Sequence, residues 1–150
     1  MPKIKRASLE DLDQLYEIEL ECFGENAYSK FILRLLLMDR RTIALKLLTD
    51  KSLAGFVIGR IERRGRKRLG RVYTLNVKPE YRGKGFGKSL MRAIEEEFKR
   101  RGCEEAVLEV AVENLQAINL YKSLGYEFKE RIKNYYGAGK DALLARKRLR

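Results

Sequence analysis

The chain has 150 residues, a length that suits one domain with its own hydrophobic core. Its 33 lysines and arginines exceed its 21 aspartates and glutamates by 12, which favours polyanionic partners such as nucleic acid, a phosphorylated cofactor or an anionic membrane. It contains no histidine, so Ser-His-Asp triads, Cys-His proteases, histidine metal sites and imidazole general bases are all excluded.

The N-terminal third predicts one strand and two helices. Lys3–Arg6 has the pattern of a short strand. Ser8 followed by Asp11 resembles a capping box, which predicts a helix with an apolar stripe that ends near Gly24. A second helix is expected over Ser29–Arg40, with the serine as its N-cap.

The middle of the chain predicts three strands and a long helix. Thr42–Leu48, Leu53–Arg63 and Arg68–Val77 are rich in strand-forming residues and are separated by short turns, so they favour an antiparallel meander. The glycine-rich stretch Arg82–Gly87 then leads into an amphipathic helix that ends at Gly102, the C-cap position.

The C-terminal third predicts a buried strand, a short helix and a hairpin. The strand is Ala106–Val112, the helix Gln116–Leu124, and the hairpin Tyr126–Tyr135 with Ala142–Arg148. The element order becomes β-α-α-β-β-β-α-β-α-β-β. It predicts an α/β (α+β) fold in which about four helices flank both faces of a mixed central sheet of about seven strands.

Cysteine usage and hydropathy indicate the cell compartment. Cys22 and Cys103 lie far apart, without a CxxC partner, and are expected to be reduced thiols. The strongest apolar run, Phe31–Met38, is interrupted by Arg34 and is far shorter than the ~20 residues that span a bilayer. We therefore expect a single domain over residues 1–150, in the cytoplasm, with no metal and no membrane partner.

The stretch Arg82–Lys88 is the first candidate binding site. Its small residues let the backbone approach a ligand, and the first N–H groups of the following helix point at an anion, which suits a pyrophosphate. Arg82, Lys84 and Lys88 add positive charge. The Walker spacing is absent, and a glycine-rich turn before a helix is by itself more often only a turn.

Glu109 is the second candidate, because it is acidic within the otherwise apolar strand Leu108–Val112. It lies either on a wet face or in a structural ion pair, or it is a carboxylate tuned for proton transfer. Tyr121, on the short helix that follows, is either a core aromatic or a catalytic group.

Together these segments resemble the GNAT superfamily of acyl-CoA-dependent N-acyltransferases over nearly the whole chain. The family's Arg/Gln-x-x-Gly-x-Gly/Ala motif falls on Arg82, Gly85 and Gly87. The subgroup that acetylates protein N-termini, which includes the RimI-like ribosomal-protein enzymes and the archaeal N-terminal acetyltransferases, is similar at residues 108–110, 114, 117–121, 124–126, 134–136 and 141–142. The resemblance implies a mostly antiparallel seven-stranded sheet with the acyl-CoA in a cleft after the fourth strand.

The resemblance also implies roles for single residues. Glu109 matches a proposed general base, Tyr121 a tyrosine near the CoA sulfur, and Tyr135 and Tyr136 tyrosines that contact the peptide backbone. The residues expected to bind acetyl-CoA, with CoA as product, are Leu75, Asn76, Val77, Arg82, Gly83, Lys84, Gly85, Phe86, Gly87, Lys88, Asn114 and Tyr121. The residues expected to bind the peptide are Glu25, Asn26, Tyr28, Asn76, Tyr135 and Tyr136.

Residues Gly24–Tyr28 resemble the family's loop between the first two helices, which reads the first substrate residues. Archaeal members carry Pro-Glu-Asn-Tyr-Pro there, with a functional glutamate. Glu25 is therefore a second candidate acid, whereas Gly24 and Ala27 depart from the proline and tyrosine of the pattern. The departure bears on the shape of the pocket for the first residue, and so on the sequence preference.

These residues lead to the hypothesis of an N-terminal protein acetyltransferase in which the peptide α-amine attacks acetyl-CoA directly. An α-amine with a pKa of ~7.7–8.0 must lose a proton first, and without histidine the base is a carboxylate, a tyrosine or water. Glu109 is the first candidate base and Glu25 the second. Tyr121 would protonate the leaving thiolate, and a backbone N–H near Asn76 or Val77 would polarise the carbonyl.

Two alternatives remain open. In the first, the protein is an acetyltransferase whose acetyl acceptor is a lysine side chain or a small amine. In the other, non-enzymatic reading, the basic hairpin 60–71 and the tail 146–150 bind nucleic acid or the ribosome, although such charge runs are usually a solvated face. The expected partners are thus protein N-termini, with ribosome docking through that hairpin, and the oligomeric state stays open between monomer and weak dimer.

Overall fold

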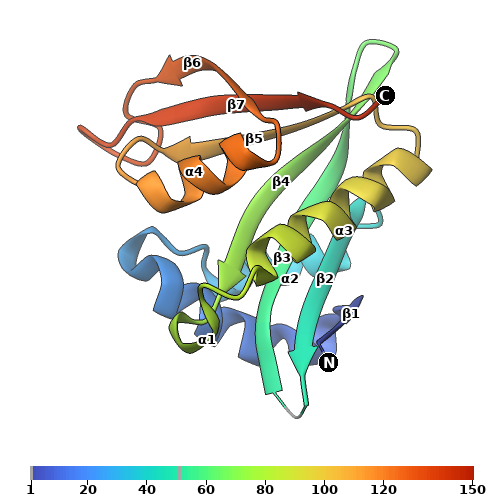
Figure 1. Ribbon diagram of the computed structural model, residues 1–150, viewed down its shortest axis with the longest axis vertical. Helices are drawn as coiled ribbons and strands as arrows, with labels where there is room; N and C mark the ends of the chain where they lie inside the picture. The colour runs from blue at the N-terminus through green and yellow to red at the C-terminus, as the bar shows by residue number, and fades with distance from the viewer. Residues whose placement is uncertain (1, 51) are drawn as a thin grey trace.

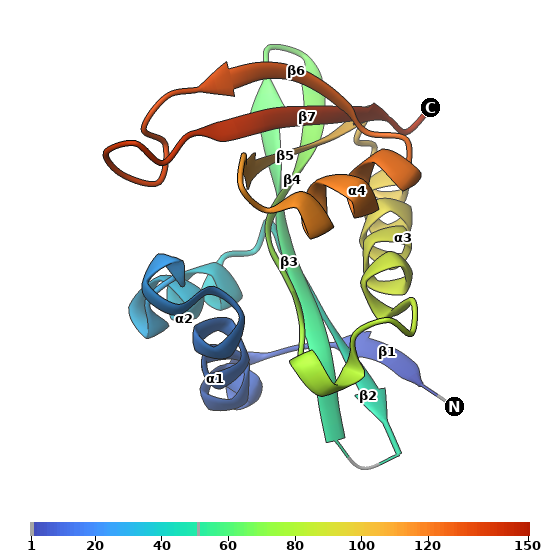
Figure 2. The same cartoon turned by 60° about the vertical axis from the view of Figure 1, so that its left-hand side comes forward.

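The computed structural model describes residues 2–50 and 52–150, and within them seven strands form one sheet in the order β1-β2-β3-β4-β5-β7-β6. The strands are β1 (Lys3–Arg6), β2 (Thr42–Thr49), β3 (Ser52–Arg64), β4 (Lys67–Val77), β5 (Glu105–Ala111), β6 (Glu127–Ile132) and β7 (Ala142–Arg148). The helices are α1 (Leu12–Phe23), α2 (Lys30–Met38), α3 (Phe86–Arg100) and α4 (Leu115–Ser123). Helices α1 and α2 cover one face of the sheet, and α3 and α4 the other (Figures 1 and 2).

The expected mixed, mostly antiparallel fold is confirmed. Each pair of neighbouring strands is antiparallel except β4 and β5, which run parallel. The predicted caps are present as well, although Ser8 caps a 3₁₀ turn, Leu9–Asp11, that leads into α1. Asp11 accepts a hydrogen bond from the Ser8 backbone N–H (2.9 Å), and Ser29 Oγ accepts one from the Ile32 N–H (3.1 Å). Of the helices in the described ranges, none is long and apolar enough to cross a bilayer.

Strand β6 ends at Ile132, so the predicted strand Tyr126–Tyr135 was too long. The reason lies at Asn134, which has a left-handed φ of 57° that breaks the extended backbone. The Asn134 backbone N–H donates a hydrogen bond to Asp141 Oδ1 (2.9 Å). The Asn134 side-chain Oδ1 accepts one from the Gly139 N–H (2.8 Å) in the same turn. Residues 133–141 therefore form a loop between β6 and β7.

Helix α3 packs directly on β3 and β4 at two glycines. A Cβ built on Gly70 would lie 2.2 Å from Phe98 Cδ2, and one on Gly59 would lie 2.7 Å from Phe98 Cζ. The Phe98 ring is fully buried and thus occupies the space that side chains would take at these positions. The bare backbone lets the apolar stripe of α3, with Leu90 and Ile94, enter the core.

Gly70→Ala is expected to lower the free energy of unfolding by about 3 kcal/mol, because overpacking a rigid core forces shifts in side chain and backbone. For a chain of this length that corresponds to a fall in Tm of roughly 6–12 °C. Thermal denaturation followed by circular dichroism checks this. An unchanged Tm would show that Phe98 moves aside freely and that α3 does not depend on the bare backbone.

Strands β4 and β5 pair over only part of their length, and this opens the sheet. Their register joins Leu69–Val72 to Glu105–Leu108 and stops there. At the same point Ile58 and Gly59 of β3 pair with Thr74 and Val72, which leaves Tyr73 as a bulge in β4. A bulge bends the strand and increases its twist. The carboxyl-terminal ends of β4 and β5 consequently diverge (Figure 1).

Candidate functional site

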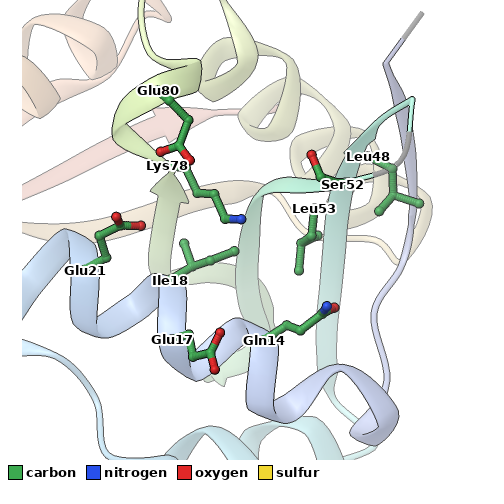
Figure 3. A pocket seen from close by; sticks show the side chains of 9 residues that line it. All are labelled: Gln14, Glu17, Ile18, Glu21, Leu48, Ser52, Leu53, Lys78 and Glu80. Carbon is green, nitrogen blue, oxygen red and sulfur yellow. The ribbon is translucent and has the colours of Figure 1, made fainter.

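A cleft of about 840 Å³ lies where β4 and β5 separate. Its volume falls within the ~300–1,000 Å³ that is typical of small-molecule sites. One wall is β4 and the other β5. The rest of the lining comes from the end of α1, the α1–α2 segment (residues 24–29), the start of α3 with the turn before it, helix α4 with the turn before it, and the β6–β7 loop (residues 133–141). A second hollow of about 610 Å³ is lined by Glu17, Glu21, Lys78 and Glu80 among others (Figure 3), and it contains none of the predicted site residues.

One end of the cleft is built to hold an anion. Gly83 and Gly85 have left-handed φ values of 79° and 81°, a conformation that glycine adopts without strain, and Gly85 is the N-cap of α3. The first N–H groups of a helix have no intrahelical partner, so those of α3 are donors for a ligand. The cleft lining includes Arg82, Gly83, Gly85, Phe86, Gly87 and Lys88, whereas Lys84 is exposed outside it.

The edge of β4 adds backbone donors in the middle of the cleft. The Lys78 N–H donates to Ala54 of β3 (2.9 Å), and successive N–H groups of a strand point to opposite sides. The N–H groups of Val77 and Leu75 therefore point away from β3, into the cleft that both residues line. The N–H group of Asn76 points toward β3 instead. The Asn76 side chain is buried, and Asn76 does not line the cleft.

Glu109 lies in a structural ion pair and also lines the cleft. Its carboxylate, only 11% exposed, accepts a hydrogen bond from Arg71, which also bonds Glu62 (3.0 Å). Burial opposes the charge of Arg71, but its bonds to the two carboxylates raise the pKa of the guanidinium above its ordinary value. Arg71 thus stays charged and holds Glu109 in place.

Tyr121 lies on α4 across the cleft. Its side chain is buried, with the ring edge-to-face against Tyr126 at 5.7 Å between centroids. Burial raises the pKa of its hydroxyl, which therefore keeps its proton at neutral pH. Asn114 lines the cleft too, and its side chain caps α4 by accepting a bond from the Ala117 N–H (3.1 Å).

Four of the residues predicted to bind peptide gather at the other end of the cleft. Asn26 and Tyr28 come from the α1–α2 segment, and Tyr135 and Tyr136 from the β6–β7 loop. Burial, and then the neighbouring Glu109 charge, raise the pKa of Tyr135. Glu25 lies outside the lining, with a side chain 83% exposed and paired to Lys140 (3.2 Å).

Sequence reasoning missed two carboxylates that line the cleft: Glu113, which follows β5, and Glu19 on α1. Glu19 is 1% exposed, lines the cleft and accepts a hydrogen bond from the Tyr28 backbone N–H (3.1 Å). A signal was present in the pattern of α1, because Leu12, Leu15, Glu19 and Cys22 follow helical spacing and place the glutamate within the apolar stripe. Arg71 was counted only as part of the basic hairpin, since its contact with Glu109 joins residues distant in sequence.

The cleft joins an anion-binding helix start, free backbone donors, a held carboxylate and a protonated tyrosine. This combination suits an enzyme that transfers a group from a phosphate-bearing donor.

Comparison with known proteins gives the same class. The model of the acetyltransferase (GNAT) family matches residues 12–126. An N-alpha-acetyltransferase of Sulfurisphaera tokodaii is 33% identical, over 95% of this chain and 90% of the relative. A putative [ribosomal protein bS18]-alanine N-acetyltransferase of Bacillus subtilis is 32% identical, over 94% and 91%. The crystal structure of the ribosomal-protein-S18-alanine N-acetyltransferase from Escherichia coli superimposes with a TM-score of 0.88 at 25% identity, over 99% and 94%. The chain belongs to the GNAT acetyltransferase family.

Proposed function

We propose that the protein transfers the acetyl group of acetyl-CoA to the α-amino group of protein N-termini. The observation that carries this proposal is that Glu109 and Tyr121 line the same cleft as the anion-binding start of α3, with four predicted peptide-contacting residues at its other end. The relatives named as N-terminal acetyltransferases, matched over nearly the whole chain, support it.

The cleft fits acetyl-CoA, which supplies an acetyl group activated as a thioester. Residues 82, 83 and 85–88 would hold the pyrophosphate, because they combine the first N–H groups of α3 with the charges of Arg82 and Lys88. The N–H groups of Leu75 and Val77, which point away from β3, would hold the extended arm that leads to the thioester, as an added strand would.

The proton transfers fall to this chain's own residues. Glu109 takes a proton from the substrate α-ammonium, and the Val77 N–H polarises the thioester carbonyl. As the nitrogen–carbon bond forms and the carbon–sulfur bond breaks, Tyr121 would give its proton to the departing thiolate, whose ordinary pKa is ~8.5. The second proton that the nitrogen loses on becoming an amide would return to the Tyr121 phenolate, whose pKa burial raises, and the proton on Glu109 would pass to solvent. Glu25 takes no part in the proton transfers, because its carboxylate lies outside the cleft.

Arg82→Gln is expected to raise the Kd for CoA about tenfold, because an arginine beside a pyrophosphate makes charge-assisted hydrogen bonds. Lys84→Gln is the matched control: it removes the same charge two residues away, outside the cleft, and is expected to change the Kd less than twofold. Calorimetric titration with CoA measures both. Equal losses of CoA affinity in the two variants would indicate a general electrostatic attraction between the basic loop and CoA. That result would contradict the assigned pyrophosphate site.

Thiol release from acetyl-CoA tests the proposed function. The acceptors are short peptides that begin with Ser, Ala, Thr, Met-Leu or Met-Glu, each made also with a blocked N-terminus and a free internal lysine. Turnover confined to free N-termini is expected. Turnover on the blocked peptides alone would contradict the proposal and indicate lysine acetylation, and CoA binding without any turnover would point to small amines.

We also propose that the β3–β4 hairpin docks the enzyme on ribosomal RNA. The cations at its tip are exposed, namely Arg63, Arg64, Arg66, Lys67 and Arg68. Arg60 and Arg71 of the same hairpin belong to internal ion pairs with Asp39 and Glu62 instead. The tip projects beyond the sheet at the top of Figure 1, away from the cleft-lining ends of β4 and β5.

The triple variant R64E/R66E/K67E is expected to abolish ribosome binding at low salt and to leave peptide turnover within about twofold. Phosphate contacts give a log–log salt slope of roughly 0.7–0.9 per contact, so the wild type should lose binding steeply as salt rises. Cosedimentation with ribosomes at several salt concentrations measures this. No wild-type binding at low salt would end the docking proposal.

A further inference from the structure

The Glu19 carboxylate joins three parts of the molecule beneath the peptide end of the cleft. It belongs to α1 and is 1% exposed. Its Oε1 accepts hydrogen bonds from Thr74 Oγ1 (2.7 Å) and Asn76 Nδ2 (3.1 Å), which lie two residues apart on β4. Its Oε2 accepts the backbone N–H of Tyr28 (3.1 Å), in the α1–α2 segment.

Burying a carboxylate costs folding free energy unless hydrogen bonds compensate for the lost solvation. Burial raises the pKa of Glu19, and its three hydrogen bonds oppose that rise. The proposed chemistry uses neither its charge nor its proton. Its bond to the Tyr28 N–H links the α1–α2 segment through Glu19 to Thr74 and Asn76 of β4. The segment is also joined to the β6–β7 loop, by the exposed pair Lys140 and Glu25 (3.2 Å).

We propose that Glu19 is a positioning residue, which fixes Tyr28 and the α1–α2 segment against β4 so that the cleft can bind the peptide N-terminus. The inference rests on the proposed function, because it assigns the peptide to this end of the cleft. The α1–α2 segment carries Asn26 and Tyr28, and β4 carries the carbonyl-polarising Val77. Glu19 therefore sets the distance between the two binding surfaces.

The acceptor atoms matter in this proposal, and the negative charge does not. Glutamine keeps one carbonyl oxygen for the Tyr28 N–H and directs its amide group toward β4. Asn76 Oδ1 is buried without a hydrogen-bond partner. Rotation of the Asn76 amide would turn this oxygen toward the glutamine NH2 group and provide its acceptor. Leucine removes both acceptors and leaves the Tyr28 N–H without its partner.

The experiment compares Glu19→Leu, Glu19→Gln and a matched control, Glu95→Leu. Glu95 is also a buried carboxylate, bonded to Tyr126 (2.8 Å) and Lys147 (2.7 Å) outside the cleft. Glu19→Leu is expected to raise the peptide KM at least tenfold, with kcat and the Kd for acetyl-CoA within threefold of wild type. Glu19→Gln is expected to stay within threefold in all three, and Glu95→Leu to lower the Tm without moving the peptide KM.

Hydrogen exchange of the Tyr28 amide, without any substrate, is the second readout. It is expected to accelerate at least tenfold in Glu19→Leu and to stay unchanged in Glu95→Leu. Should Glu19→Leu fail to fold, Thr74→Val removes one of the three bonds and is expected to accelerate the same amide by a smaller factor.

Two results would overturn the proposal: unchanged exchange at Tyr28 in folded Glu19→Leu, or a kcat loss in Glu19→Gln as large as in Glu19→Leu, which would indicate proton transfer by Glu19. Failure of the proposed function is distinguishable, because it appears as wild-type inactivity on every peptide, while the exchange readout still decides whether Glu19 holds the α1–α2 segment.

Discussion

Glu109→Gln is expected to lower kcat for peptide acetylation about 10²- to 10³-fold at pH 7, within the range that general-base catalysis contributes. Glutamine keeps the size of the side chain and a bond to Arg71, which also remains bonded to Glu62. The loss is expected to shrink as the pH rises past ~8, because the free α-amine then needs no base. Initial rates from pH 6 to 9 with saturating acetyl-CoA measure the effect.

Glu105→Gln is the control on the same strand. Glu105 pairs with Arg146 (3.5 Å) outside the cleft, so its neutralisation is expected to leave kcat within about twofold. Near-wild-type turnover by folded Glu109→Gln across the whole pH range would rule out Glu109 as the base. An ordered water or Glu19 would then have to accept the proton.

Tyr121→Phe is expected to lower kcat about tenfold to hundredfold and to leave the Kd for acetyl-CoA unchanged. The variant removes only the hydroxyl, while the buried ring and its contact with Tyr126 remain. Without a proton donor the thiolate must leave unprotonated or take its proton from water, which slows the breaking of the carbon–sulfur bond. Single-turnover kinetics with saturating peptide measure this step.

Tyr126→Phe separates catalysis from stability. The Tyr126 hydroxyl donates to Glu95 (2.8 Å) on the side away from the cleft. Its loss is expected to lower the Tm and to leave kcat within about twofold, because a buried acceptor loses its partner. A similar kcat loss in both variants would mean that Tyr121 only supports the core.

Local sequence signals predicted most of the fold. Ser8, Ser29 and Gly102 marked helix ends by capping chemistry, and alternating apolar residues marked the strands, so the element order agreed with the structure. The divergence of β4 from β5 had no such signal. It depends on the bulge at Tyr73, which arises from pairing between distant segments.

The candidate site was predictable where one stretch of chain carries it. Residues 82–88 form a continuous turn and helix start, and all of them except Lys84 line the cleft. Contacts between distant segments were not predictable from the sequence. Glu19 meets Thr74 and Asn76 only because α1 packs across β4, whereas Glu25, six residues further along, faces solvent.

The central claim is that the acetyl group goes to the α-amine of a polypeptide. One peptide with both a free N-terminus and an internal lysine tests it directly. After incubation with enzyme and acetyl-CoA, tandem mass spectrometry locates the added acetyl group, and the Glu109→Gln variant gives the background. We predict acetylation of the α-amine, with the lysine unmodified above background. Acetylation of the lysine with a free N-terminus would contradict the claim.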